Sequence, residues 1–181
     1  MAWVAAETDS SLASRVREAA LLEGDFVLSS GKRSRFYVDK YLFSTEPGLL
    51  TELAREISAK LPADTERLAG VELGAVPLVV AASLQIGLSY CIVRKGVKDY
   101  GTSNRIEGRS LEAGEKVVLI EDVVTTGTQV LRAVATLEEA GVEVLGILAV
   151  LDRRDEHSAN LGGYPFKALL TLEDLGLATR D

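Results

Sequence analysis

The sequence predicts an α/β fold in which a central parallel sheet is flanked by helices. From about Leu68 onward, short apolar runs alternate with stretches of helical periodicity, which is the pattern of strands joined by crossover helices. The runs are rich in Val, Ile and Leu, as strands buried on both faces usually are. The 181 residues, 47% apolar and 26% charged, suffice for one globular domain with a sizeable core.

The first part of the chain predicts a helix, a hairpin and a second helix. Leu12 to Leu22 has apolar residues at helical spacing behind two serines that can cap it. Phe26 to Asp39 contains two short β-type runs around a turn of Ser, Gly and basic residues, which indicates a hairpin or a bent strand pair. Thr45 to Leu61 is amphipathic and carries Pro47 in its first turn, where a missing N–H costs little.

The second part of the chain supplies the elements of the parallel sheet. The predicted strands and helices are, in order, strand 68–71, helix 77–86, strand 89–94, strand 117–120, helix 129–140 and strand 142–151. Gly141 is expected to close the second of these helices. Between two strands lies Lys95 to Glu115, a polar loop with four glycines, and loops of this length are uncommon unless they are lids or disordered linkers.

Charge and composition exclude several classes of function. The net charge of −7 argues against a nucleic-acid partner, because phosphate-backbone binding needs a broad basic face. Neither a signal-like start nor a run of apolar residues long enough for a bilayer is visible, so we expect neither export nor a membrane span. The only cysteine, Cys91, cannot form an internal disulfide, which favours a cytoplasmic protein. His157 is the only histidine, and we expect it in an exposed loop without a zinc site.

One segment carries most of the chemical information, because it joins an acidic pair to a turn of small polar residues. The apolar run Val117 to Ile120 predicts a buried strand, so Glu121 and Asp122 are expected at its carboxyl end, where open α/β sheets bind ligands. The next helix begins with unpaired amides that suit a phosphate monoester, and Gly127 lets the backbone approach it closely. Acids beside such a cradle fit a sugar phosphate. The alternative is a solvated strand end followed by an ordinary turn.

The long loop concentrates positive charge in an acidic protein, with four Arg or Lys residues between Arg94 and Arg105. A lid that brings these cations to a pyrophosphate would neutralise the leaving group and exclude water. A hydrated surface loop is the alternative interpretation.

The strand, acid pair and turn resemble the phosphoribosyl pyrophosphate signature of the type I phosphoribosyltransferases. The resemblance implies that fold, with residues 1–181 as a single domain. A small hood would comprise mainly residues 1–45 plus the C-terminal segment, and the core would span about 46–155. It also implies that phosphoribosyl pyrophosphate is bound by the acid pair and the turn that follows it: Glu121, Asp122, Val123, Val124, Thr125, Thr126, Gly127, Thr128 and Gln129.

The basic loop narrows the resemblance to the orotate phosphoribosyltransferase family, whose loop has the form Arg-Lys-x-x-Lys-x-His-Gly followed by Ile/Val-Glu-Gly. The matching positions of this chain are Arg94, Lys95, Lys98, Gly101, Glu107 and Gly108. Tyr100 stands where many members have His, and a phenol there can still donate a hydrogen bond to a phosphate oxygen. Arg94, Lys95, Lys98 and Tyr100 are therefore expected to bind the diphosphate.

The hairpin resembles the element that covers the orotate site in this family, although Ser29 replaces a substrate-binding Lys of some members. Tyr37 and Val38 match positions that flank the pyrimidine, although packing of the hairpin on the core is an equally good explanation of its aromatic residues. The resemblance assigns orotate binding also to Thr125 and Arg153, since a guanidinium can pair with the orotate carboxylate; the alternative for Arg153 is a structural ion pair.

The sequence also resembles the family's pyrophosphate loop between Gly70 and Pro77, within which Glu72 could instead have a structural role. The implied reaction is displacement at ribose C1 by a ring nitrogen of orotate, giving orotidine 5-monophosphate for UMP synthesis. Arg94, Lys98 and Asp122 are the expected catalytic residues. Mg²⁺ is the expected cofactor, held mainly by substrate oxygens and water rather than by protein ligands.

The resemblance further implies a homodimer in which the loop of one subunit reaches the site of the other. Three alternatives stay open. They are a transferase for a purine base, a phosphoribosyl pyrophosphate sensor that regulates gene expression, and a silent paralogue that keeps only the fold. A regulator would be expected to add a DNA-binding motif or a basic RNA-binding face.

Overall fold

The computed structural model describes residues 11–27, 31, 33–96 and 105–177. The helices of this part are α1 (Leu12–Ala20), α2 (Lys40–Thr45), α3 (Pro47–Ala59), α4 (Ala75–Ile86) and α5 (Thr128–Glu139). The strands are β1 (Leu21–Val27), β2 (Arg33–Val38), β3 (Arg67–Val71), β4 (Tyr90–Val93), β5 (Ile106–Gly108), β6 (Lys116–Val124), β7 (Glu143–Asp152), β8 (Asn160–Leu161) and β9 (Tyr164–Thr171).

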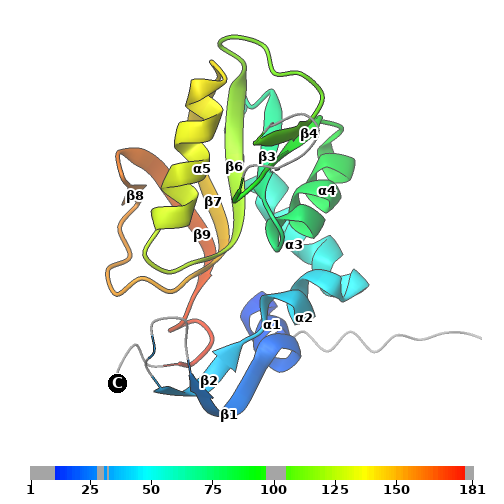
Figure 1. Cartoon of the computed structure of the whole chain (residues 1–181). Helices are drawn as coiled ribbons and strands as arrows, with labels where there is room; N and C mark the ends of the chain where they lie inside the picture. The colour runs from blue at the N-terminus through cyan, green and yellow to red at the C-terminus, as the bar shows by residue number, and fades with distance from the viewer. Residues whose placement is uncertain (1–10, 28–30, 32, 97–104, 178–181) are drawn as a thin grey trace, which may run out of the picture.

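A seven-stranded sheet in the order β5-β4-β3-β6-β7-β9-β8 forms the centre of the fold (Figure 1). The five inner strands are parallel to one another, whereas the edge strands β5 and β8 run antiparallel to their neighbours. Helix α5 covers one face, and α3 and α4 lie over the other. The predicted α/β class is thus confirmed, with antiparallel strands added at both edges.

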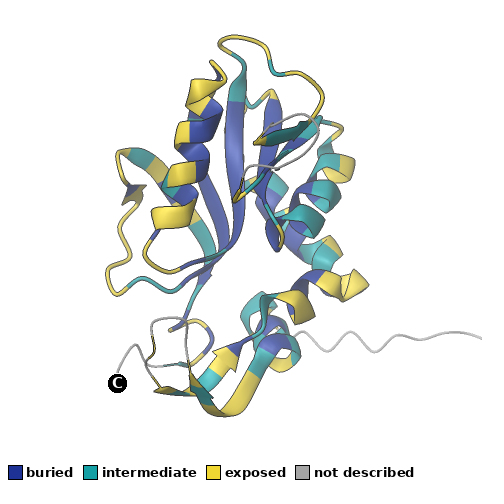
Figure 2. Ribbon diagram, in the orientation of Figure 1, coloured by how far each residue is buried: buried dark blue, intermediate teal, exposed yellow. Residues whose placement is uncertain are grey.

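Alternating side chains of the central strands divide the core into two apolar clusters. In β6, Val118 and Ile120 pack with residues of α3 and α4, whereas Val117 and Leu119 pack with residues of α5. This two-residue period follows from the opposite directions of successive side chains in a strand. The central strands β3, β6 and β7 are mostly dark blue in Figure 2, so a polar side chain in the middle of β6 has no water to solvate it.

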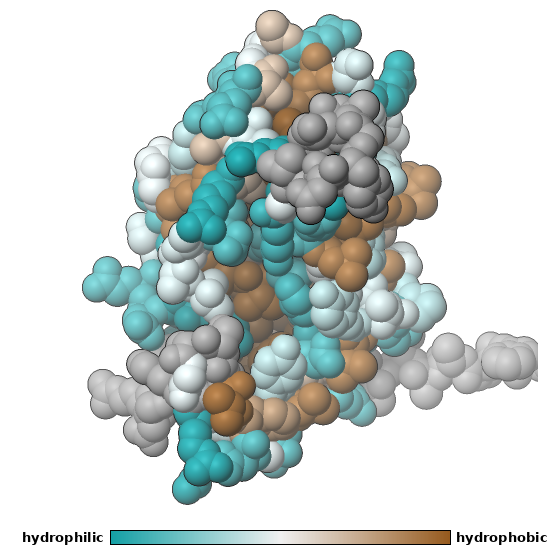
Figure 3. Space-filling model, in the orientation of Figure 1, coloured by the Kyte–Doolittle hydropathy of each residue, from teal (hydrophilic) through white to brown (hydrophobic). Residues whose placement is uncertain are grey.

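The hood begins with α1 and continues through the antiparallel pair β1-β2 and the short helix α2. It lies at the end of the sheet toward which β6, β7 and β9 run with their carboxyl ends (Figure 1). Val16, Ala20 and Phe43 anchor it in the cluster that also contains α3 and α4. Val27 of β1 is 72% exposed, and apolar atoms are visible at this end of the molecule as well as elsewhere on the face shown in Figure 3.

The C-terminal segment differs from the boundaries expected from the sequence. The expected core range ends at about residue 155, but β9 pairs with β7 from Ile147↔Phe166 to Asp152↔Thr171, so the central sheet includes it. Only the chain after Thr171 reaches the hood, where Leu175 is buried and its carbonyl accepts a hydrogen bond from Arg17 of α1. The chain therefore returns to the hood only after a fifth parallel strand is complete.

Among the described residues, no helix is long and apolar enough to cross a membrane.

Candidate active site

The acid pair lies inside β6 rather than at its end, because the strand continues to Val124. Glu121 is 4% exposed and Asp122 2%, so the alternative of solvated residues at a strand end is excluded. Burial and the neighbouring Asp122 raise the pKa of Glu121 to about 8, because a carboxylate loses hydration in the sheet and faces a second negative charge. The pair is therefore a dry acidic site in which burial and the neighbouring carboxylate favour the neutral form of Glu121.

The turn after β6 is open where the acid pair is closed. Thr125, Thr126, Thr128 and Gln129 are all exposed. Gly127 precedes the first residue of α5 with φ of +77°, and a Cβ there would lie 2.6 Å from Leu161 Cδ1. Gly127 has no side chain to cap the helix, and although the N–H of Thr128 donates to Thr126 Oγ1 at 3.4 Å, the amides that follow it remain available to an anion.

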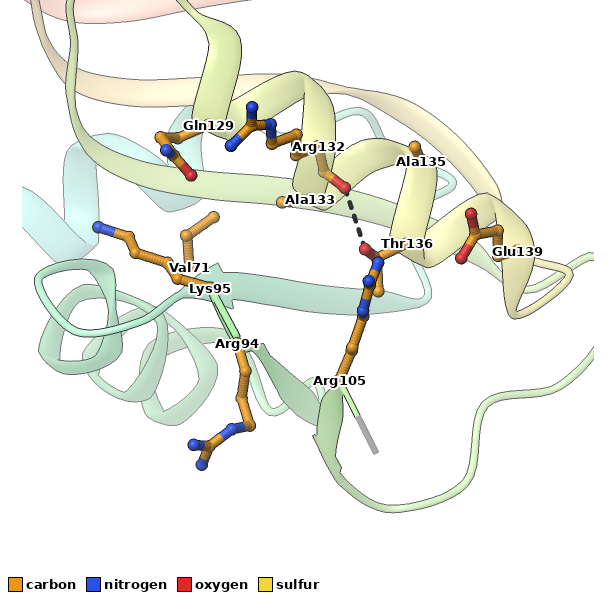
Figure 4. Close-up of a pocket in the computed structure, with 10 residues that line it drawn as sticks. All are labelled: Val71, Arg94, Lys95, Arg105, Gln129, Arg132, Ala133, Ala135, Thr136 and Glu139. Atoms are coloured by element: carbon orange, nitrogen blue, oxygen red, sulfur yellow. Dashed lines mark hydrogen bonds between the residues drawn. The ribbon is translucent and has the colours of Figure 1, made fainter. Parts of the chain in front are cut away.

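The described part of the basic loop divides its cations between two directions. Lys95 donates its backbone N–H to Glu72 Oε1 at 2.6 Å, which ties the start of the loop to the turn after β3 and gives Glu72 a structural role. Lys95 and Gln129 line a pocket of about 390 Å³ together with Arg94, Arg105 and Arg132. The guanidinium of Arg94 points away from Lys95 and Gln129 (Figure 4) and lies 3.6 Å from Glu107.

Lys98, Tyr100 and Ser29, three positions on which the sequence comparison placed weight, lie outside the described residues. Arg105 and Arg132 were not predicted as site residues. Helical spacing could have indicated Arg132, because it follows Gln129 by three positions and so lies on the same face of α5.

Arg153 has a buried Nε atom without a hydrogen-bond partner in the described structure. Its backbone N–H donates to Val124 O at 2.8 Å, which places it beside the end of β6 and next to Thr125. Burial lowers the pKa of Arg153, and the neighbouring Tyr37 opposes that effect. A half-desolvated guanidinium with spare donors is suited to an anionic ligand.

The two hood residues predicted to flank the base have different surroundings. Tyr37 is 38% exposed, and its ring lies 5.7 Å from that of Phe26. Val38 is 4% exposed and packs in the core with α3 and α4. Of these two residues, only Tyr37 thus presents its side chain at the surface of the hood.

Next to Arg153, a buried acid organises the loop that leaves β7. Asp152 is 2% exposed and accepts hydrogen bonds from Arg154 Nε at 2.9 Å and from His157 Nδ1 at 3.0 Å. The guanidinium of Arg154 also stacks 4.2 Å above the ring of Phe166. Two consecutive arginines therefore have opposite surroundings, because Arg154 is fully engaged and Arg153 is not.

Lys40, which the sequence did not indicate, completes the acid site. Its Nζ lies 2.7 Å from Asp122 Oδ2, although the two residues are far apart in the chain. The hood therefore contributes a cation directly to the acid pair.

A strand with a buried acid pair, an open helix start and a spare guanidinium defines a site for an anionic sugar phosphate, and the family model for the phosphoribosyl transferase domain matches residues 48–163. The chain is a phosphoribosyltransferase by class. More narrowly, it belongs to the orotate phosphoribosyltransferase family.

Curated relatives support the narrower assignment. The orotate phosphoribosyltransferase of Halobacterium salinarum is 45% identical over 167 residues, which are 91% of this chain and 94% of the relative. That of Thermoplasma volcanium is 50% identical over 140 residues, or 77% and 82% of the two chains. Both similarities extend over most of the chain and include the acid pair and turn.

Solved structures show the same relationship. The orotate phosphoribosyltransferase of Aeropyrum pernix superposes with a TM-score of 0.77 at 30% identity, covering 91% of this chain and 98% of the other. The Mycobacterium tuberculosis enzyme in complex with phosphoribosyl pyrophosphate gives a TM-score of 0.72 at 31% identity, covering 92% and 97%. An adenine phosphoribosyltransferase from Leishmania donovani, at 16% identity, shares the fold alone.

Proposed function

We propose that the protein transfers the ribose 5-phosphate group of phosphoribosyl pyrophosphate to orotate, giving orotidine 5-monophosphate and pyrophosphate. The proposal rests mainly on the order of three features along two adjacent strands. The buried acids of β6, the open start of α5 and the spare guanidinium after β7 follow one another at the same edge of the sheet. Family membership and the names of the curated relatives agree with this substrate pair.

The chemistry requires positive charge on the ribose ring and negative charge on the departing diphosphate to be stabilised at the same time. The acid pair holds the ribose hydroxyls and favours charge on the ring, while the amides after Gly127 bind the 5-phosphate. Lys95 faces the leaving group from the pocket that it shares with Gln129. Lys98 and Tyr100, outside the described residues, are proposed to complete the diphosphate site.

Mg²⁺ is proposed as the cofactor, and the donor atoms of the chain can be tested against it. Among the described residues, no group of three or more His, Cys, Asp or Glu side chains could hold a metal ion. We propose that the ion is carried mainly by the diphosphate and ribose oxygens and by water. When bound, the ion would neutralise diphosphate charge and fix the geometry of the donor substrate.

Orotate is expected between the hood and the end of β7. Its carboxylate suits the unpaired donors of Arg153, and its ring lies in reach of Thr125 and Tyr37 in this proposal. Once a ring nitrogen has lost its proton, orotate is an electron-rich nucleophile that needs no strong general base. The acceptor site therefore works mainly by binding and orienting an anion.

A homodimer that shares the basic loop is proposed as the working form, as the resemblance to the orotate phosphoribosyltransferase family implies. The guanidinium of Arg94 points away from Lys95 and Gln129 (Figure 4), which leaves it free to act in a neighbouring subunit in this proposal. Subunit mixing tests this directly. If Arg94→Ala and Asp122→Asn each retain only weak residual activity and the loop crosses the interface, an equal mixture forms heterodimers with one native site. Activity should then recover to roughly a quarter of wild type by random pairing. A mixture no more active than the separate variants would contradict the sharing.

The defining experiment supplies phosphoribosyl pyrophosphate and Mg²⁺ with orotate, uracil, adenine, guanine and hypoxanthine in parallel. Consumption of orotate with release of pyrophosphate is expected, at a rate far above that with any other base. Turnover of a purine instead would replace the proposed acceptor, and binding of the donor without turnover of any base would indicate a sensor. We also propose that the reaction serves UMP synthesis in the cytoplasm. Fractionation of cells that express the protein at native level tests that location.

A further inference from the structure

Lys40 is the first residue of α2, and it places a hood ammonium against the more deeply buried acid of the pair. Its Nζ lies 2.7 Å from Asp122 Oδ2, with the Lys40 side chain 26% exposed and that of Asp122 2%. Apart from Lys40, Oδ2 has no hydrogen-bond partner in the described structure. The ammonium is therefore the only counter-charge that the described residues offer to this oxygen at contact distance.

The other contacts of Asp122 fix the direction of its carboxylate. Its Oδ1 accepts the backbone N–H of Val123 at 2.5 Å, and its own N–H donates to Glu121 Oε1 at 3.1 Å. A carboxylate held at both oxygens has one orientation. It is therefore already oriented when a ribose hydroxyl binds to it. The contact to Oδ1 comes from β6 itself, and the contact to Oδ2 comes from Lys40.

Gly74, in the turn between β3 and α4, closes over the same oxygen. A Cβ at this position would overlap Asp122 Oδ2 and would come within 3.2 Å of Lys40 Cε. Three segments from different parts of the chain, α2, the turn before α4 and β6, therefore meet at one carboxylate oxygen. Such convergence leaves no room for Asp122 to turn while Lys40 stays in place.

The charges around the pair make the contact energetically important. Lys40 experiences the charges of Asp122, Tyr41 and Glu121, and Glu121 experiences those of Asp122 and Lys95. Burial lowers the pKa of Lys40, but its hydrogen bond to Asp122 and the negative charge there outweigh this and leave the pKa raised. Lys40 is thus a cation in the folded protein, and removing one partner of a buried pair leaves an uncompensated charge.

The connection between hood and sheet is short. The same stretch, residues 37–40, contains Tyr37, which acts electrostatically on Arg153 at the base end, and Lys40, which contacts Asp122 at the ribose end. Docking of this stretch therefore completes both ends of the site in one step.

From this geometry we infer that Lys40 is a positioning residue that orients the Asp122 carboxylate for the ribose of the donor substrate. The inference rests on the proposed function and adds a role for the hood beyond covering the base. Lys40 acts through Asp122, so its contribution should vanish where Asp122 cannot accept an ion pair.

A double-mutant cycle tests this dependence. Lys40→Met should lower kcat/KM for phosphoribosyl pyrophosphate by about tenfold or more, whereas the same change in an Asp122→Asn background should alter it less than about twofold. The KM for orotate should stay within about threefold, because the change lies at the ribose end. Lys40→Arg keeps the charge and should recover part of the loss. A purely structural lysine would lower activity equally in both backgrounds.

The matched control is Arg33→Met, which removes a hood cation whose partner Asp25 is 66% exposed and should leave the kinetics near wild type. Equal losses in the two Asp122 backgrounds would overturn the inference, as would tighter donor binding in Lys40→Met, which would make Lys40 a competitor of the ribose. If Lys40→Met does not fold, Lys40→Gln enters the same cycle.

Two results separate this inference from the proposed function. Wild type that turns over no base contradicts the proposed function. The inference is then tested alone by calorimetry with ribose 5-phosphate. Lys40→Met should bind this ligand more weakly than wild type. The double variant Lys40→Met/Asp122→Asn should bind it as well as Asp122→Asn does. Active wild type with an unaffected Lys40→Met contradicts only the inference.

Discussion

The two halves of the donor site differ in how they meet solvent. The acid half, Glu121 and Asp122, is buried. Its carboxylates accept hydrogen bonds from backbone N–H groups of β6, and Lys40 and Gly74 pack against Asp122 Oδ2. In the phosphate half, from Thr125 to Gln129, every residue except Gly127 is exposed, and the half offers backbone amides instead of buried charges. A buried charge depends steeply on its neighbours, whereas several amides share the binding of an anion. Substitutions should therefore act strongly in the first half and weakly in the second.

The largest effect is expected from Gly74→Ala, because the added methyl group would overlap Asp122 Oδ2. Displacement of reacting groups by about 1 Å can cost on the order of a hundredfold, so we expect a loss of that size in kcat/KM for the donor. Steady-state kinetics measures it. Gly48→Ala is the control, since its Cβ would meet only the ends of the Glu46 and Arg15 side chains. Near-wild-type turnover in Gly74→Ala would show that the acid half tolerates movement.

The consecutive arginines after β7 extend the contrast to the acceptor site. Arg153→Met should raise the KM for orotate by about 10- to 100-fold, the value of a lost charge-assisted contact, with little change in the free energy of unfolding. Arg154→Met should instead lower that free energy by about 2–4 kcal/mol, because it strips Asp152 of a bidentate partner. Urea titration and orotate kinetics on both variants check the pair. If Arg153→Met lost stability and Arg154→Met lost orotate affinity instead, the roles assigned to the two arginines would be reversed.

The pH dependence of the free energy of unfolding can be used to measure the contribution of Glu121 separately. Its pKa is raised from 4.5 to about 8 in the folded protein, so its contribution is fully present below pH 4.5 and is lost as pH rises through 8. Glu121→Gln cannot ionise and should gain stability relative to wild type across that window, reaching on the order of 1–4 kcal/mol. Unfolding by urea at pH 5 and pH 8.5 measures the gain, with exposed Glu18→Gln as the control. A difference that does not grow with pH would refute the charge argument.

The smallest effect is expected in the phosphate half. Thr126→Val removes a hydroxyl that lies 3.0 Å from Thr128 Oγ1 but leaves every backbone amide in place. The KM for phosphoribosyl pyrophosphate should rise by roughly threefold with kcat nearly unchanged. Thr51→Val, which loses a hydroxyl on α3, is the isosteric comparison. A loss as large as that of Gly74→Ala would remove the distinction between the halves.

Local patterns predicted the elements that carry the phosphate half. The apolar run of β6, the Thr-Gly turn and the periodicity of α5 are all properties of neighbouring residues, and helix 129–140 was placed within one residue of α5. The strand itself was ended too early, because two acids normally mark its exit to solvent. In the structure, Val123 and Val124 continue the pairing with β7, opposite Leu151 and Asp152.

What the sequence could not provide depends on contacts between distant segments. Helix α2 has six residues, too few to show a helical period, so Lys40 had no predicted place. Its pairing with Asp122 exists only once the hood and sheet have assembled. His157 was expected in an exposed loop and lies in one, but its contact with Asp152 could not be inferred from the polar residues around it. The site was therefore predictable in its chemistry and not in its coupling to the hood.

The sheet borders have a consequence for the protein at high concentration. Its outer strands, β5 and β8, have three and two residues, too short to recruit a strand from another molecule. Strand β8 pairs with only Tyr164 and Pro165 of β9, and deleting residues 153–163 would leave all eight residues of β9 without a strand on that side. Such a deletion should therefore favour strand-to-strand aggregation relative to the intact chain, which light scattering can compare.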